Sequence, residues 1–224
     1  MNMFITDVEH KLNLVNYCDV HVRKMITEQA QMLSTAHRVL DGVKGTLLVY
    51  SKKDKKFILK QYNFVLRHLG EEGSTPALYL KTHENHPNNL WIRKSILNYR
   101  YAYHLFITML DEYEYRFGKK HESSKLRHDL KQVPRNLKNI KMTPFVWDQT
   151  YQYINNVTDA YKKIFVDKFR EWSLSNAMLI NGVPNPVRKR LVDVSWTKRN
   201  LPEFIDNETL DMIFTYHAKK ELRC

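Results

Sequence analysis

A row of polar side chains with acid–base character occurs early in the chain: His21, Lys24, Glu28, Gln31 and Thr35. On a helix of about 3.6 residues per turn, His21 and Glu28 would lie almost in line. A carboxylate flanked by a histidine and a lysine could act as a general base or stabilise a developing cation. An exposed polar helix face with helix-spaced ion pairs would show the same row. Spacing alone leaves both interpretations open.

The row requires a helix, and residues 19–40 have the pattern of one. Asp19 is the expected N-cap, and Asp41-Gly42 should end the helix. Apolar residues at helical spacing would face a core: Val22, Met25, Ile26, Ala30, Leu33, Ala36 and Leu40. The preceding MNMFIT predicts a short strand.

A second polar row lies on a long helix predicted for residues 88–117, which should end at Gly118. Its members are Arg93, Arg100, His104 and Asp111. Two arginines one heptad apart could hold successive phosphates. If this row faces the first, the two form a basic cleft with a carboxylate inside; otherwise it is a solvated face.

The remaining patterns predict a mainly α protein: one compact helical domain, residues 1–224, with an insertion at 43–75 and a C-terminal extension at 175–224. In the insertion, two β-type runs flank SKKDKK, which predicts a hairpin with a lysine-rich tip. Residues 119–141 predict a short helix and a loop split by Pro134. Further helices should begin at Thr158 or Asp159 and cover 207–220, with NGVPNPVRKR as a linker.

The formal charge of +12 and pI near 9.5 favour a polyanionic partner. Nucleic acid is the commonest such partner and anionic membrane the second, but no window approaches the length of a membrane span. Two cysteines cannot form a disulfide framework or a zinc knuckle, so we expect a reducing cytoplasm. The residues expected to contact DNA are His21, Lys24, Gln31, Arg93, Arg100, His104, Lys119, Lys120, Lys125 and Arg127.

Several enzyme classes lack their motifs here. There is no Gly-rich phosphate loop, no Ser nucleophile elbow and no paired CxxC, which argues against P-loop hydrolysis, α/β-hydrolase chemistry and zinc deamination. We expect no cofactor. His83 and His86 have a His-x-x-His spacing, but no third ligand follows at a recognisable spacing. We therefore expect no metal site, and instead expect this loop to cap a helix that begins near Pro87.

Several motifs resemble a phage enzyme family. Asp19-x-His21 with Glu28 resembles the first helix of the pyrimidine-dimer DNA glycosylases, the endonuclease V type of T-even phages. DEYEYRFGKK is similar to that family's acidic-to-Arg-Gly helix end, and AYKKIF and WTKRNLPEF to its C-terminal region. Phage proteins with CDxHVxKM, THENHP and WxKRxxPE motifs resemble the chain more closely still.

This resemblance implies a mostly helical enzyme that binds duplex DNA in the cytoplasm of an infected cell. It also implies two catalytic groups. The N-terminal amine attacks the deoxyribose C1′ and forms an imine, and a helix glutamate stabilises the cationic intermediate. By this resemblance, Glu28 is the catalytic carboxylate and the Met1 amine the nucleophile. The chain departs from the family because residue 2 is Asn, which should retain Met1, and because His21 lies further from the N-terminus.

The leading expectation is thus a DNA glycosylase with possible abasic-site lyase activity. One alternative is a phage protein that binds nucleic acid without catalysis, which needs the charge but not the carboxylate. Another is a factor whose basic face meets an acidic protein partner. A base-modifying transferase on a glycosylase-like scaffold is a fourth, and it would need a second small substrate.

Overall fold

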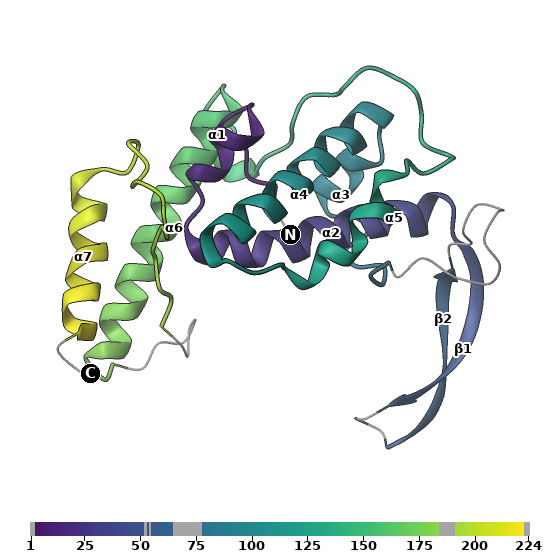
Figure 1. Cartoon of the computed structure of the whole chain (residues 1–224), viewed down its shortest axis with the longest axis horizontal. Helices are drawn as coiled ribbons and strands as arrows, with labels where there is room; N and C mark the ends of the chain where they lie inside the picture. The colour runs from purple at the N-terminus through teal and green to yellow at the C-terminus, as the bar shows by residue number, and fades with distance from the viewer. Residues whose placement is uncertain (1–2, 52, 54, 65–77, 184–190, 222–224) are drawn as a thin grey trace. The chain divides into compact units, whose positions relative to one another are not determined.

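The computed structural model describes residues 3–51, 53, 55–64, 78–183 and 191–221, and Figure 1 shows its helices and hairpin. It confirms a mainly α fold with a small β insertion. The elements, in chain order, are α1 (His10–Val15), α2 (Asp19–Leu40), β1 (Val43–Ser51), β2 (Lys56–Phe64), α3 (Pro87–Ile92), α4 (Ile96–Phe117), the 3-10 helix η1 (Glu122–Leu126), α5 (Arg127–Lys131), η2 (Gln149–Tyr151), α6 (Val157–Ile180) and α7 (Asn207–Glu221).

The chain packs as two compact units, a division that the expected single domain did not anticipate. Unit 1 comprises Met1–Met3, Met25–Leu110 and Lys120–Val146, and unit 2 comprises Phe4–Lys24, Asp111–Lys119 and Trp147–Cys224. Both long helices, α2 and α4, therefore contribute residues to each unit. Each unit is described below by itself.

The core of unit 1 forms where α2 meets α4. The predicted apolar residues that α2 contributes to unit 1 are buried, except for the half-buried Leu40. Gln29 Nε2 donates to the Ala102 carbonyl at 2.9 Å, and His37 Nε2 lies 2.8 Å from the Tyr99 hydroxyl. The same hydroxyl lies 2.8 Å from the Leu130 carbonyl, so Tyr99 links His37 of α2 to α5. These polar contacts fix the register of the two helices.

Aromatic side chains dominate the core of unit 2. The cluster comprises Phe4, Tyr17, His21, Phe165, Phe169, Trp172 and Trp196, with ring centroids 4.5–6.1 Å apart. These rings come from the N-terminal segment, α2, α6 and the segment before α7. Helices α6 and α7 also pack side by side (Figure 1). Residues far apart in sequence thus share one apolar core.

Residues 3–6, the described part of the segment predicted as a strand, do not form a strand. Asn13 Nδ2 donates to the Phe4 carbonyl at 3.0 Å, and the Tyr17 hydroxyl donates to the same carbonyl at 2.6 Å. The Thr6 amide donates to Asn13 Oδ1 at 2.7 Å. These contacts satisfy buried backbone groups that a neighbouring strand would otherwise satisfy.

The helix predicted for 88–117 is two helices, α3 and α4, separated at 93–95. Ser95 explains the break, because its Oγ accepts from the Asn98 amide at 3.0 Å and caps α4. Helix α4 ends as predicted, since Gly118 has φ +65°. The cap of α6 is Asn156, whose Oδ1 accepts from the Thr158 amide at 2.8 Å; it is neither Thr158 nor Asp159.

The hairpin is confirmed, with β1 and β2 antiparallel in the register Val43↔Phe64 to Ser51↔Lys56. The predicted helix at 207–220 corresponds to α7, and residues 119–141 form η1, α5 and a loop. The second half of the insertion and the VRKR segment lie outside the described residues.

Candidate functional site

The THENHP loop of unit 1 is fixed between α2 and α3. Thr35 Oγ1 donates to the Thr82 carbonyl at 3.3 Å and lies 3.2 Å from the amide of the same residue, which donates back to it. Asn89 Nδ2 donates to the carbonyls of Thr82 and His83 at 3.2 and 2.8 Å. His83 has φ +46°, which is uncommon for a residue other than glycine. The polar row of α2 thus holds this loop at its Thr35 end.

His86 links this loop to Glu28 electrostatically. Its Nδ1 accepts from the Asn88 amide at 3.2 Å, which confirms the predicted cap of α3. The neutral ring therefore carries its proton on Nε2. Burial and the charge of His83 lower the pKa of His86, while the Glu28 carboxylate opposes this shift. Glu28 is half-buried on α2 and acts on a histidine that is neutral near pH 7.

Two buried polar atoms near this loop have no hydrogen-bond partner in the described structure. Arg93 Nη2 donates to the Glu84 carbonyl at 2.7 Å, but Arg93 Nη1 is buried without a partner. Asn88 is 3% exposed, and its Oδ1 also lacks a partner. An unsatisfied buried group costs about 1–3 kcal/mol. We name Glu28, Gln31, His86, Asn88 and Arg93 the Glu28 site.

The two polar rows do not face each other within unit 1. The side of α4 that contacts α2 carries Tyr99 and Ala102, whereas Arg100 and His104 are exposed. The expected basic cleft enclosing a carboxylate is therefore not formed by these rows. Arg93 is the one member of the second row that belongs to the Glu28 site, and its guanidinium anchors the loop backbone. Arg100 and His104 remain accessible to a phosphate.

His21 is buried and does not lie on a DNA-facing surface. Its ring is 3% exposed and stacks on Phe165 with centroids 4.5 Å apart and planes 15° apart. Cys18 Sγ lies 3.4 Å from its Nδ1. Burial, with Lys168 and Lys24, lowers the pKa of His21 to about 3, and burial raises the pKa of Cys18 to about 12. Neither side chain is poised for chemistry, which corrects the expected role of His21.

The buried His21 should make folding stability depend on pH. Its pKa is lower in the folded state than the unfolded value of about 6.5, so the unfolded chain binds more protons below pH 6.5. This stabilisation should be complete above pH 6.5 and fall towards pH 3, by up to about 1.4 kcal/mol per pH unit. Urea unfolding between pH 4 and 8 measures it.

A His21→Phe variant is the matched control, because phenylalanine can stack on Phe165 without titrating. In this variant the free energy of unfolding should depend less steeply on pH than in the wild-type protein. Some pH dependence should remain, since burial also lowers the pKa of His37. Equal slopes in the two proteins would contradict a buried neutral His21.

Sequence reasoning missed a buried ionic network in unit 2 centred on Arg116. The guanidinium donates to four residues: to Tyr17 O at 2.7 Å, Asp19 Oδ1 at 3.1 Å, Leu14 O at 3.0 Å and Glu112 Oε1 at 2.6 Å. Arg116 is 2% exposed. All of its nitrogens therefore have acceptors in the absence of water.

Two carboxylates carry this network to the WTKR segment. Asp19 accepts from Thr197 Oγ1 at 2.6 Å and Ser195 Oγ at 3.1 Å, so it joins another segment and is not a simple N-cap. Glu112 accepts from Arg199 Nη2 at 2.7 Å. Burial raises the pKa of Glu112, but bonds from Arg199 and Arg116 outweigh it and the net shift is downward. Residues of the CD, EYEYR and WTKR stretches are thus partners in one structural network.

The remaining predicted phosphate contacts are exposed or engaged locally. Lys24, Lys119, Lys120 and Arg127 are exposed, and Gln31 is half-buried. Lys125 forms an ion pair with Glu122 on the surface. Met1 lies outside the described residues. These cations lie on the surface of the described structure, where a polyanion could contact them.

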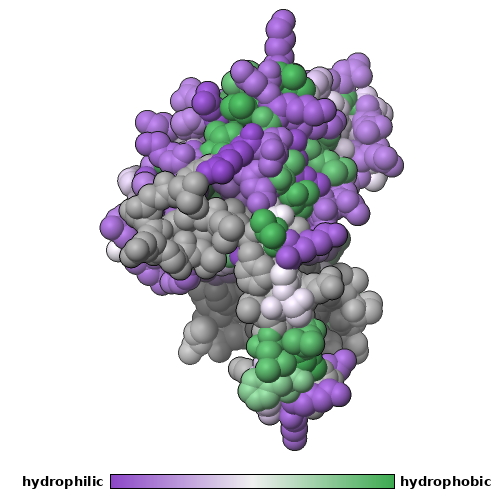
Figure 2. All heavy atoms as spheres, turned by 90° about the vertical axis from the view of Figure 1, so that its right-hand side faces the viewer, coloured by the Kyte–Doolittle hydropathy of each residue, from purple (hydrophilic) through white to green (hydrophobic). Residues whose placement is uncertain are grey.

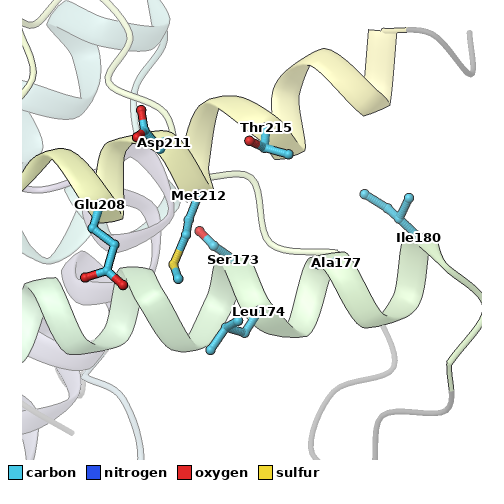
Figure 3. A pocket seen from close by; sticks show the side chains of 8 residues that line it. All are labelled: Ser173, Leu174, Ala177, Ile180, Glu208, Asp211, Met212 and Thr215. Carbon is cyan, nitrogen blue, oxygen red and sulfur yellow. The ribbon is translucent and has the colours of Figure 1, made fainter.

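Unit 2 also contains a groove of about 310 Å³ between α6 and α7 (Figure 3). Leu174, Ala177, Ile180 and Met212 line it, and Glu208 and Asp211 project from α7 beside them. None of its lining residues is cationic. The two carboxylates would repel a phosphate, so this groove does not suit nucleic acid.

No protein-family model matches the chain, and neither a curated protein nor a solved structure matches it. Among the described residues, no helix is both long and apolar enough to cross a membrane. In the same part of the chain, no three His, Cys, Asp or Glu side chains gather as metal ligands do.

Proposed function

We propose that the protein is a nucleic-acid enzyme that attacks an N-glycosidic bond at the Glu28 site, a DNA glycosylase with abasic-site lyase activity. The observation that carries the proposal is a half-buried carboxylate that acts electrostatically on a neutral histidine, His86, which caps the helix followed by Arg93. Asn88 and Arg93 each have a buried polar atom without a partner. The charge of +12 supports a polyanionic substrate. The motif resemblance supplies the reaction class.

The chemistry requires a nucleophilic amine near Glu28. Met3 Sδ lies 3.9 Å from Gln29 Nε2, and Met3 is two residues from Met1. An α-amine has an unperturbed pKa of about 7.7–8.0, so a useful fraction is neutral near pH 7. Its nitrogen would bond to C1′ while the bond from C1′ to the base breaks, and the base leaves with a proton. The Nε2–H of His86 would supply that proton to the base. The C1′–O4′ bond would then break, with a proton passing from the attacking nitrogen to O4′, and Glu28 would stabilise the iminium that this ring opening leaves at C1′.

Borohydride trapping tests the proposal. The protein is incubated with undamaged, ultraviolet-irradiated and abasic-site duplexes in the presence of borohydride, which reduces an imine to a stable covalent bond. We expect an adduct with damaged or abasic DNA that peptide mapping places on the Met1 amine. Absence of adduct and strand cleavage on every substrate, with DNA binding intact, would reject it.

Salt dependence tests the nucleic-acid partner independently of chemistry. Each phosphate contact contributes about −0.9 to the slope of log K against log salt. Arg100→Gln and Lys120→Gln, at two exposed cations of unit 1, should each reduce that slope by about 1 and weaken all sequences alike. Fluorescence anisotropy with a labelled duplex measures both effects.

Lys163→Gln is the matched control for this measurement, because Lys163 Nζ is already paired with Asp167 Oδ1 in unit 2. This variant should leave the slope unchanged. A salt-independent affinity in the wild-type protein would instead favour an acidic protein partner.

A base-modifying transferase is the second candidate, because unit 2 contains a cavity of about 780 Å³, a size that suits a small second substrate. Thr6, Asn16, Lys162, Lys198 and Phe204 are among its lining residues. Base modification without strand cleavage, dependent on an added small molecule, would favour it over the glycosylase.

A further inference from the structure

The β-ribbon of unit 1 carries an apolar face that no described element covers. Residues paired across antiparallel strands share a face, and so do residues two apart along one strand. The pairs Leu48↔Leu59 and Tyr50↔Phe57 therefore lie on the same side. Their side chains are 61%, 73%, 55% and 65% exposed, in that order. Figure 2 shows this hydrophobic surface on the ribbon, with hydrophilic side chains at its end.

An exposed apolar face of this kind favours a binding partner that would cover it. An isolated two-stranded ribbon is marginally stable in water, and large exposed apolar patches mark interaction sites. The rings of Tyr50 and Phe57 contact edge to face, with centroids 5.4 Å apart. They present aromatic surface to solvent at the outer part of the ribbon. Burying it on a partner would stabilise the ribbon.

The positive charge of the ribbon indicates which kind of partner would bind this face. Residues 43–64 contain six lysines and a single acidic residue, Asp54. Lys44, Lys53, Lys55 and Lys56 are exposed. Two copies of so cationic a ribbon would repel each other if they paired face to face, which disfavours a second copy of the chain. A polyanion with apolar surface satisfies both the lysines and the aromatic face.

We propose that this ribbon face binds unpaired bases of a nucleic-acid strand, with Tyr50 and Phe57 stacking on the bases and the lysines holding the adjacent phosphates. A closed duplex buries its base faces, so only single-stranded or locally opened DNA offers the aromatic surface that the ribbon requires. The surface is separate from the Glu28 site and needs no chemistry there.

The double variant Tyr50→Thr/Phe57→Thr tests this, because threonine favours strands and preserves the ribbon while removing the rings. Anisotropy with a labelled single-stranded thymidine oligomer should show an affinity loss of at least about tenfold. The loss of affinity should persist at about 0.5 M salt, a concentration at which phosphate contacts are largely screened. Closed-duplex affinity should change far less.

Tyr153→Thr is the matched control, since Tyr153 is 72% exposed in unit 2 and far along the sequence from the ribbon. It should bind the oligomer as the wild-type protein does. An unchanged affinity in the double variant would overturn the inference. Light scattering that shows a wild-type dimer, dissociated in the double variant, would also overturn it. So would a double variant that loses binding to phosphatidylserine vesicles but keeps its affinity for the oligomer. None of these results depends on glycosylase activity.

Discussion

Arg116→Met should lower the free energy of unfolding of unit 2 by about 3–5 kcal/mol, the largest stability effect that we expect from one substitution. Methionine fills much of the same volume, but the change leaves the buried Asp19 carboxylate as an uncompensated charge. It also removes the donors for the carbonyls of Leu14 and Tyr17. Urea unfolding followed by tryptophan fluorescence measures the loss, because Trp172 and Trp196 lie in the same unit.

Lys119→Met is the control, since Lys119 is exposed and lies three residues further along the same unit. Its effect should stay within about 0.5 kcal/mol. Similar small losses in both variants would mean that the network adds little to folding. Arg116→Lys should be costly as well, because an ammonium cannot reproduce the planar fork that reaches four acceptors.

Glu28→Gln should reduce the yield of trapped adduct and the rate of strand cleavage by about 10²–10⁴-fold, the range typical of a lost acid–base group. Glutamine keeps the shape and hydrogen-bonding capacity of the side chain but removes the charge that would stabilise an iminium. DNA affinity should stay equal or rise slightly, because a negative charge is lost. Single-turnover cleavage of an abasic-site duplex separates chemistry from binding.

Glu114→Gln is the matched control, because Glu114 is exposed on α4 in unit 2, outside the Glu28 site. It should cleave as fast as the wild-type protein. If Glu28→Gln also kept the wild-type rate, Glu28 would be a helix-surface residue and the proposed chemistry would lose its main support. If Glu28→Gln lowered both the cleavage rate and the melting temperature, Glu28 would have a structural role instead.

The Glu28 site and the Arg116 network divide the sequence motifs by function. Residues of CD, EYEYR and WTKR meet in the Arg116 network, so these residue types are explained by folding. THENHP packs on Thr35, and Asn88 and Arg93, which follow it, each have a buried polar atom without a partner, so folding alone does not explain this region. A bound substrate or ordered water would satisfy those atoms. The THENHP loop is therefore the better candidate for a site of chemistry.

Local sequence determined the elements of this protein. Helical spacing of apolar residues placed α2 between residues 19 and 40, and Gly118 ended α4 because only a few residue types adopt positive φ readily. The alternation around SKKDKK gave the hairpin, and His86 before Pro87 gave the cap of α3. These signals depend on neighbours within a few residues. The Ser95 cap was equally local and could have divided the helix predicted for 88–117.

Tertiary structure decided which faces of those elements are buried. His21 and Glu28 share a helix face by spacing, yet one is enclosed by Phe165 and Trp172 while the other is half-exposed. The enclosing rings come from more than 140 residues further along the chain, so no local pattern could reveal them. The partners of Asp19 and Arg116 were hidden for the same reason. Burial and ion pairing are long-range properties, and they alone separated a core histidine from a candidate catalytic carboxylate.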